Sequence, residues 1–248
     1  MSSYSSTAAI VLAALLLAAC QSTASRQPPP LAMERVVTEQ RPEGCSGENC
    51  PLVNIDTLRF PDEPALERLI DARLRAMTQT APDDRLPASL EAYQRDFLAH
   101  AEPRWSTYLQ AKPRDHHDTL VVIELSSYLD RGGAHGMPGR GFINYDLEQD
   151  RALTLEDVLL PGQEERFWAL AEQAHRDWLQ GNQPADDPQF AERWPFQRTN
   201  NVALLADRVL LKYDVYSLGP YSMGHPELSI PYGQLDGVLR PERLPEPH

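Results

Sequence analysis

The sequence predicts an α+β fold in which an antiparallel sheet is packed against helices on one face. Apolar and polar side chains alternate from Val53 to Leu58, and Thr119–Leu129 begins with β-branched and apolar residues, as a strand would. Glu164–Gln180 instead places its apolar residues at the period of an amphipathic helix. Strands and helices do not alternate regularly, so an antiparallel sheet is favoured over a parallel β-α-β arrangement.

The first predicted elements are one strand and two helices. The strand covers Leu52–Phe60. A helix follows it, because Asp62 can cap a helix and Pro64 suits a first turn, and apolar residues at helical spacing continue to Met77. A second helix is expected over Ser89–Ala101.

The middle of the chain predicts a hairpin, a loop and another strand. Trp105–Lys112 and Thr119–Leu129 form the hairpin, and the second of them resembles a central strand. Asp130–Gly141 contains five glycines in twelve residues and is expected to be a loop. Phe142–Leu147 is the next strand.

The last third predicts two helices and three strands. A capping box at Thr154–Asp157 begins a short helix, and Glu164–Gln180 forms a longer one. Strands are expected near Phe196–Leu205, Val209–Leu218 and Glu227–Pro231. The remaining segments are expected to be two loops and a frayed tail, at Gly181–Pro195, Gly219–Pro226 and Pro241–His248.

The N-terminus predicts a lipoprotein signal. Ala8–Ala19 is an unbroken apolar run of twelve residues, whereas a membrane span needs about 20. Leu17–Cys20 resembles a bacterial lipobox, in which the signal is cut before a cysteine that then carries diacylglycerol. We therefore expect a signal peptide at 1–19 and a lipidated Cys20. The alternative is an ordinary secretory signal with an incidental cysteine, and the absence of Lys and Arg before the apolar run departs from the usual pattern.

The expected lipid places the protein at the outer membrane, on its periplasmic side. Gln21 follows the cysteine, where lipoproteins retained in the inner membrane of Gram-negative bacteria typically carry Asp. Residues 20–49 read as a tether rich in proline, which keeps a chain extended. In that oxidising compartment Cys45 and Cys50 are expected to form a disulfide, and the alternative is a thiol pair that binds metal.

The net charge of the chain indicates which classes of partner it can bind. The 248 residues contain 23 Lys+Arg and 36 Asp+Glu, a formal net charge of −13. This argues against nucleic acid, because phosphate binding needs clustered cations. Residues 116–248 carry 11 basic and 21 acidic groups, so they hold most of the negative charge. An acidic module attracts cationic partners, although solubility alone also explains such a charge.

Five strings resemble the ectodomain of the RsiV-type proteins, the lysozyme-sensing anti-sigma factors. They are Tyr128–Gly136, Phe142–Leu147, Leu153–Leu159, Tyr216–Gly224 and Leu228–Tyr232. The resemblance implies two consecutive subdomains, a small one at 50–118 and an RsiV-like one at 119–240, followed by a tail at 241–248. The small subdomain also precedes a peptidoglycan deacetylase domain in other proteins. We expect neither a sigma-binding segment nor a deacetylase domain here, so the resemblance implies a binding module.

Two loops are the candidate binding edge. The residues singled out in them are Gly132, Gly133, His135, Gly136, Pro220, Tyr221 and Met223. Glycines allow a tight loop, and aromatic residues and methionine anchor partners. His135 is either a hydrogen-bonding residue of its loop or a ligand-binding one.

Metal binding and hydrolysis are weaker alternatives. His116, His117, His135 and His225 could gather a zinc ion only if the fold brought them together. A triad of Ser126 or Ser127 with His135 lacks the Gly-x-Ser-x-Gly motif. We therefore expect no catalytic residue, metal or cofactor. The expected function is a lipid-anchored envelope module that binds lysozyme or peptidoglycan; a cell-wall glycan-processing enzyme and a structural envelope lipoprotein are the alternatives.

Overall fold

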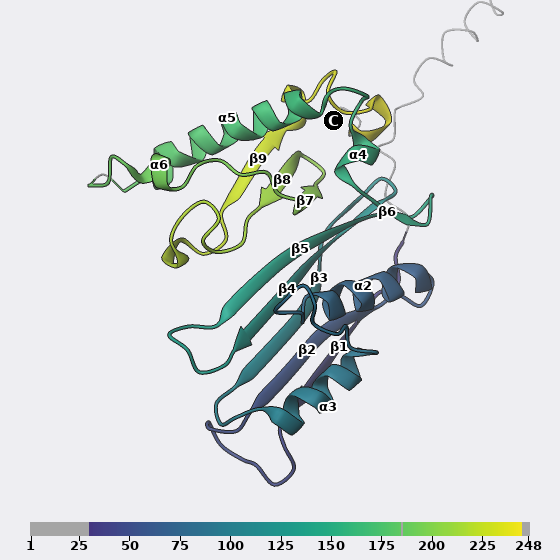
Figure 1. Ribbon diagram of the computed structural model, residues 1–248. Coiled ribbons are helices and arrows are strands. Elements are labelled where there is room, and N and C mark those ends of the chain that lie inside the picture. The colour runs from purple at the N-terminus through teal and green to yellow at the C-terminus, as the bar shows by residue number, and fades with distance from the viewer. Residues whose placement is uncertain (1–29, 185, 245–248) are drawn as a thin grey trace, which may run out of the picture. The chain divides into compact units, whose positions relative to one another are not determined.

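The computed structural model describes residues 30–184 and 186–244, and it confirms the α+β fold with two sheets (Figure 1). The described residues belong to one compact unit. The first sheet comprises β1 (Glu34–Gln40), β2 (Leu52–Arg59), β3 (Ser106–His117), β4 (Leu120–Asp130), β5 (Met137–Asp146) and β6 (Arg151–Leu153). The second comprises β7 (Val202–Leu204), β8 (Arg208–Lys212) and β9 (Glu227–Pro231). The α-helices are α2 (Pro64–Ala76), α3 (Leu90–His100), α4 (Leu155–Val158), α5 (Glu164–Asn182) and α6 (Phe190–Arg193), and three short 3-10 turns are η1 (Tyr221–Met223), η2 (Tyr232–Gln234) and η3 (Pro241–Arg243).

The strands of the first sheet follow the chain order from β1 to β6. All neighbours are antiparallel except β2 and β3, which are parallel. The prediction of an antiparallel sheet is therefore right for four of its five pairs. The parallel pair arises because α2 and α3 lie between β2 and β3 in the sequence, and a helical crossover returns the chain in the same direction.

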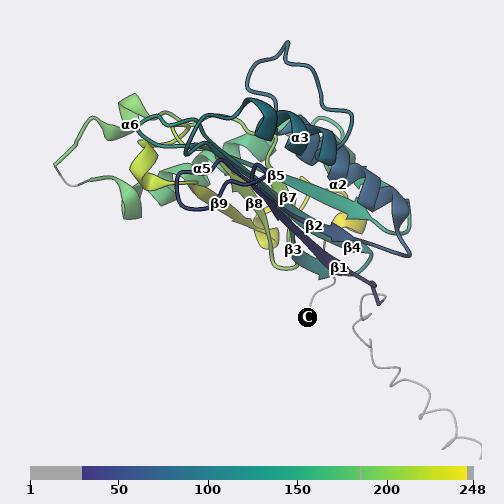
Figure 2. The same cartoon turned by 90° about the horizontal axis from the view of Figure 1, so that it is seen from below.

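Helices α2 and α3 cover one face of this sheet, as predicted, and lie side by side on it (Figure 2). Leu66, Ile70 and Leu74 on the inner side of α2 are buried. They belong to an apolar cluster that includes Val53 of β2 and Ile123 of β4. The apolar residues that recur at helical spacing in α2 and those that alternate along the strands therefore pack together in one core.

The second sheet carries the long helix α5, which packs against β9. Phe167 and Ala171 of α5 are buried in a second apolar cluster with Val209 of β8 and Ile230 of β9. Val122 of β4 belongs to the same cluster. The core of the second sheet therefore reaches the face of the first sheet opposite α2 and α3.

The structure confirms the predicted capping box and the predicted helix start at Ser89, but not the cap predicted for α2. Ser89 caps α3, and Thr154 and Asp157 form the predicted capping box of α4. At α2 the N-cap is Glu63, not Asp62, and its side chain makes no capping hydrogen bond. Pro64 at the first position explains this shift, because its fixed φ already suits the first turn of a helix.

Several boundaries differ from the prediction. β5 begins at Met137, so the glycine-rich loop is shorter than Asp130–Gly141, because Gly139 and Gly141 pair with Ser127 and Leu125 of β4. Strand pairing here overrides the turn preference of glycine. The two strands expected after residue 195 are shortened to β7 and β8, and the loop predicted before them contains α6.

Part of the predicted tether is a strand. Residues 34–40 form β1, and every residue of β1 pairs with a residue of β2. Most of the side chains of β1 are exposed, which explains why no apolar alternation marks it. The predicted subdomain boundary between residues 118 and 119 lies in the tight turn between β3 and β4, inside one sheet.

None of the helices in the described part of the chain combines the length and apolarity that a membrane span requires.

Candidate functional site

The two loops predicted as a binding edge lie against each other in the structure. They connect β4 to β5 and β8 to β9 (Figure 1). The rings of His135 and Tyr221 stack with centroids 3.7 Å apart and an interplanar angle of 19°. Tyr216 completes the group, with its ring centroid 6.1 Å from that of His135 and 5.7 Å from that of Tyr221. We call His135, Tyr216 and Tyr221 the aromatic cluster.

Local bonds shape the loop that carries His135. The Asp130 carboxylate accepts a hydrogen bond of 2.8 Å from the Gly132 N–H, which closes a side-chain turn. Gly132 has a φ of +78°, which glycine adopts at no steric cost. At Gly136 an added Cβ would lie 2.3 Å from Cζ of Tyr128, so the close approach of that ring requires glycine.

His135 is held by hydrogen bonds on both sides of its ring. Nδ1 lies 3.2 Å from the Gly136 carbonyl oxygen, and Nε2 lies 2.9 Å from the Tyr216 hydroxyl. A carbonyl only accepts, so Nδ1 carries the proton in the neutral ring and Nε2 accepts from Tyr216. The imidazole is thus both oriented by its loop and part of the surface that the two loops share.

The loop between β8 and β9 carries Tyr216 and Tyr221, and its backbone is unusual at Tyr216. Tyr216 has a φ of +67°, in the left-handed region that non-glycine residues rarely adopt, and it is 46% exposed. Tyr221 begins η1 after Pro220, and its hydroxyl donates a 3.0 Å hydrogen bond to the Gly136 carbonyl. Gly219 packs closely against Met223, since a Cβ there would lie 2.5 Å from its Sδ and the methionine side chain would have to move.

Two further polar contacts involve the β8–β9 loop: one joins it to strand β5, and the other lies within the loop. The Asp214 carboxylate accepts a 2.9 Å hydrogen bond from the Arg140 backbone N–H. His225 Nδ1 lies 3.0 Å from the Tyr213 carbonyl oxygen. Burial lowers the pKa of His225, and the charge of Arg140 lowers it further, so this imidazole is neutral near pH 7. Gly133 lies in the β4–β5 loop, and Met223 ends η1 in the β8–β9 loop.

The geometry offers little for the alternatives of hydrolysis and metal binding. The nitrogens of His135 contact Gly136 and Tyr216 rather than Ser126 or Ser127. His116 and His117 lie at the end of β3, and burial lowers the pKa of both. Within residues 30–184 and 186–244, no group of three or more His, Cys, Asp or Glu side chains has the geometry to hold a metal ion.

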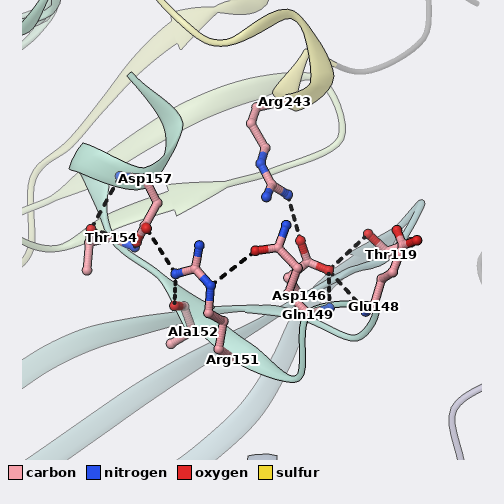
Figure 3. Close-up of polar contacts among 9 residues, drawn as sticks. All are labelled: Thr119, Asp146, Glu148, Gln149, Arg151, Ala152, Thr154, Asp157 and Arg243. Atoms are coloured by element: carbon pink, nitrogen blue, oxygen red, sulfur yellow. Dashed lines mark hydrogen bonds and ion pairs between the residues drawn. The ribbon is translucent and has the colours of Figure 1, made fainter. Parts of the chain in front are cut away.

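A second polar cluster surrounds Asp146 at the far end of β5 (Figure 3). This buried carboxylate accepts hydrogen bonds from the backbone N–H groups of Glu148 and Gln149. It also forms an ion pair with Arg243, at 2.7 Å. Burial raises the pKa of Asp146, but the bonds outweigh it and the net pKa lies below its usual range. Because Arg243 belongs to η3, the contact fastens the C-terminal segment to the first sheet.

The predicted cysteine roles fall on different parts of the chain. Cys45 and Cys50 form a disulfide, with Cα atoms 5.8 Å apart, as expected. Cys20 lies outside the described residues.

Sequence reasoning did not select Tyr216, Asp214 or Tyr128 as individual site residues. Tyr216 and Tyr128 stand inside the strings that carry the family resemblance, so that resemblance was a usable signal. Asp214 acts on the backbone of Arg140, 74 residues away, and no local pattern announces such a contact.

Comparisons with known proteins agree with this fold. A family model described as "Protein of unknown function (DUF3298)" matches residues 156–233. A crystal structure of a DUF3298 family protein from Bacteroides fragilis NCTC 9343 has a TM-score of 0.66 at 17% identity, covering 87% of this chain and 96% of that one. No curated protein matches the chain.

A DUF3298 family protein from Pseudomonas aeruginosa PAO1 is much more similar. Its crystal structure has a TM-score of 0.84 and 57% sequence identity, and the match covers 89% of this chain and 99% of that one. The crystallised protein therefore consists almost entirely of the region that matches this chain. At this identity and coverage, the present chain belongs to the DUF3298 family.

Proposed function

We propose that this protein is a lipid-anchored binding module of the cell envelope, without catalytic activity, that engages a partner through the aromatic cluster. In this proposal the lipid on Cys20 holds it at the outer membrane, on the periplasmic side. The relationship to the RsiV-type ectodomains is part of the same proposal. It is supported by the five strings, two of which supply His135 and both tyrosines.

The meeting of the two loops carries the proposal. Tyr216 is 46% exposed, so its ring faces solvent at the aromatic cluster, and Met137, two residues after His135, is 54% exposed. Tyr216 also adopts a left-handed backbone. Such outliers concentrate at ligand-binding sites, where the surrounding structure maintains them. Rigid aromatic anchors are the residues that contribute most to protein interfaces.

The charge favours a cationic protein such as lysozyme as the partner, and peptidoglycan is the second candidate. Residues 116–248, which contain the aromatic cluster, carry 21 acidic and 11 basic groups. Opposite charge speeds the encounter of two proteins and is screened by salt. Salt does not screen the buried contacts of aromatic residues, so the binding that remains at high salt measures their contribution to the affinity.

Retention on immobilised lysozyme tests the proposal. We expect residues 28–245 to be retained at low salt, less at high salt, and at least tenfold less when Tyr221 is replaced in Tyr221→Ala. His100→Ala on α3 is the matched control, because His100 is exposed and lies on the other side of the first sheet from the second sheet. Absence of retention at low salt would remove lysozyme as the partner. Retention that Tyr221→Ala leaves unchanged would remove the aromatic cluster as the site.

The anchor is tested separately in cells that express the full chain. Incorporation of labelled palmitate is expected in the wild type and lost in Cys20→Ser. A wild-type chain that takes up no label would contradict the lipid anchor and the localisation that depends on it.

A further inference from the structure

The face of the first sheet opposite α2 and α3 carries a row of polar side chains. Neighbours that pair across four strands form this row: Asp56 of β2, Gln110 of β3, Ser126 of β4 and Arg140 of β5. Paired residues place their side chains on the same face of a sheet. Leu125, next to Ser126, is buried in the core under the helices, so the row lies on the other face. A carboxylate, an amide, a hydroxyl and a guanidinium thus stand side by side.

A pocket of about 350 Å³ opens over Gln110, Ser126 and Arg140. Its volume is at the lower end of the range for small-molecule sites, which begins at about 300 Å³. Such sites are usually lined mainly by apolar side chains. Among the described residues that line this pocket, only Pro138 has a side chain without a polar group. The ligand that fits is therefore small and polar.

Hydrogen-bond acceptors and donors alternate along the row. Nε2 of Gln110 donates to the Asp56 carboxylate at 2.7 Å, which leaves the side-chain carbonyl of Gln110 as an acceptor. The Ser126 hydroxyl can donate or accept. Nη1 of Arg140 donates to the Gly139 carbonyl at 2.8 Å, and the guanidinium has further N–H donors. Neighbouring hydroxyl groups on a ligand match this pattern, because each hydroxyl both donates and accepts.

A buried carboxylate borders the row. Glu124 is 2% exposed and lines the pocket, and its Oε1 accepts a 2.7 Å hydrogen bond from Lys212. Within residues 30–184 and 186–244, its Oε2 has no hydrogen-bond partner, although Nζ of the half-exposed Lys112 lies 3.5 Å away. Lys112 can turn toward solvent and leave Oε2 to a ligand hydroxyl. Hydrogen bonds from hydroxyls to carboxylates are among the strong ones.

Two tyrosine rings adjoin the row. Tyr108 and Tyr128 pair directly across β3 and β4, and both line the pocket. Side chains paired in this way are close enough to form one surface. The Tyr128 ring also packs against Gly136, where an added Cβ would lie 2.3 Å from its Cζ. Aromatic rings offer apolar faces beside polar groups. The C–H face of a sugar ring can pack on such a surface while its hydroxyls reach the polar row.

We propose that this pocket binds a saccharide, with a sugar ring against Tyr108 and Tyr128 and its hydroxyls at Gln110, Ser126 and Arg140. The site is separate from the protein partner proposed for the aromatic cluster. Because the glycan chain of peptidoglycan is a saccharide, the inference deepens the second candidate of the proposed function and rests on it for the location at the cell envelope.

Titration calorimetry on residues 28–245 with chitotetraose, cellotetraose and maltotetraose tests the proposal. We expect at least one of these tetrasaccharides to bind with a Kd of about 1 mM or tighter. Citrate is the control, because it carries carboxylates but no sugar ring, and it is expected to bind roughly tenfold more weakly or not at all. Citrate that binds as tightly as the saccharides would identify an anion site at Arg140 and the lysines instead.

Two variants locate the site. Tyr108→Ala removes one of the two rings and is expected to weaken saccharide binding roughly tenfold or more. Arg140→Gln removes the guanidinium at the surface and is expected to weaken it about fivefold. Arg95→Gln is the matched control and is expected to change nothing, because Arg95 is exposed on α3, on the other side of the sheet. Thermal denaturation of each variant checks that it is folded.

The proposal is overturned if none of the three tetrasaccharides binds, if citrate binds as tightly, or if Tyr108→Ala and Arg140→Gln both bind like the wild type. Retention on lysozyme separates this proposal from the proposed function. Loss of saccharide binding in Tyr108→Ala with lysozyme retention intact is the expected result. Retention of a wild type that binds no saccharide removes the saccharide site alone, and saccharide binding without retention removes lysozyme alone.

Discussion

The two faces of strand β4 are built on different principles. On the side of α2 and α3, Val121, Ile123 and Leu125 are all buried in an apolar cluster. On the opposite side Val122 is apolar, but Glu124 and Ser126 are buried polar residues. One face is therefore stabilised by area removed from water, and the other depends in part on specific bonds.

Strand β5 repeats this contrast. Ile143 and Tyr145 belong to the core under the helices, whereas Asn144, between them, is 7% exposed on the other side. The Asn144 amide donates to the Val202 carbonyl and accepts from the Leu204 N–H, both at 2.8 Å. One side chain thus satisfies two backbone groups of β7.

These bonds determine where the second sheet lies. Apolar burial is not directional, so it does not by itself set the position of one sheet on another. Asn144, the Lys212–Glu124 ion pair and the Asp214–Arg140 contact each have a defined geometry. Because the second sheet carries the loop of Tyr216 and Tyr221, the polar face of the first sheet positions the aromatic cluster.

The largest expected effect comes from the helix-covered face. Ile123 is fully buried, and Ile123→Ala removes apolar atoms and leaves a cavity. We expect the free energy of unfolding to fall by about 3 kcal/mol, measured by urea denaturation. Hydrogen exchange is expected to speed up across the first sheet, β2 to β5, rather than in one loop. A loss below about 1 kcal/mol would contradict the assignment of this face as an apolar core.

Asn144→Ala tests the polar face. The change leaves the Val202 carbonyl and the Leu204 N–H without their partner, at a cost of about 2 kcal/mol. Exchange of amide hydrogens is expected to speed up mainly in β7 and β8 and at Arg140. Asn182→Ala is the control, since Asn182 is exposed at the end of α5 and donates a single bond to the Trp178 carbonyl. Equal acceleration in both sheets would mean that Asn144 does not specifically hold the second one.

Glu124 provides a pH test of the same face. This carboxylate is 2% exposed and lies 2.7 Å from Lys212 Nζ. Burial raises the pKa of Glu124, but its hydrogen bond with Lys212 and the lysine charges outweigh this, so the pKa in the folded protein is below the usual value. A lowered pKa means that the contribution to stability is present above the unfolded pKa of about 4.3 and is lost as the pH falls through the lower folded value.

Glu124→Gln is therefore expected to lower the free energy of unfolding by about 1.5 kcal/mol at pH 7 and progressively less below pH about 4. Urea denaturation at several pH values gives the difference between variant and wild type. Glu172→Gln is the control, because Glu172 forms an exposed pair with Arg176 that contributes little at any pH. A difference for Glu124→Gln that does not change with pH would show that its charge is not what stabilises the contact.

The predictable parts of the fold are those whose pattern is local. Ser89 and Thr154 mark helix starts by their own chemistry, and both cap their helices. The capping box and the helical stripe of α5 need no knowledge of distant residues. The two candidate loops were also predictable, because runs of glycine, proline and aromatic residues mark exposed turns.

Contacts between distant segments were not predictable. β1 is mostly exposed and pairs with β2, where Arg35 forms an ion pair of 2.7 Å with the buried Asp56. Because Asp56 lies 21 residues after Arg35, the sequence around Arg35 does not show this contact, and the segment was predicted to be a tether. The extension of β5 through Gly139 and Gly141 likewise depends on pairing with β4. The bridging role of Asn144 depends on residues about 60 positions later.

Tyr216 gives the smallest expected effect on stability and separates a binding role from a structural one. Tyr216→Phe keeps the ring and the left-handed backbone but removes the 2.9 Å hydrogen bond to His135, at a cost of less than about 1 kcal/mol. Tyr216→Gly removes the ring as well but relieves the backbone strain, because glycine adopts a positive φ without steric cost. Thermal denaturation is therefore expected to place Tyr216→Gly at or above Tyr216→Phe in stability.

Binding is expected to rank the same two variants in the opposite order. If the exposed ring contacts a partner, Tyr216→Gly loses more retention on lysozyme than Tyr216→Phe, although it is the more stable protein. A strained residue that weakens the fold and strengthens binding is typical of a functional surface. If Tyr216→Gly is instead much less stable than Tyr216→Phe, the ring supports the loop itself. The aromatic cluster would then belong with Asn144 and Glu124, among the contacts that hold the second sheet in place.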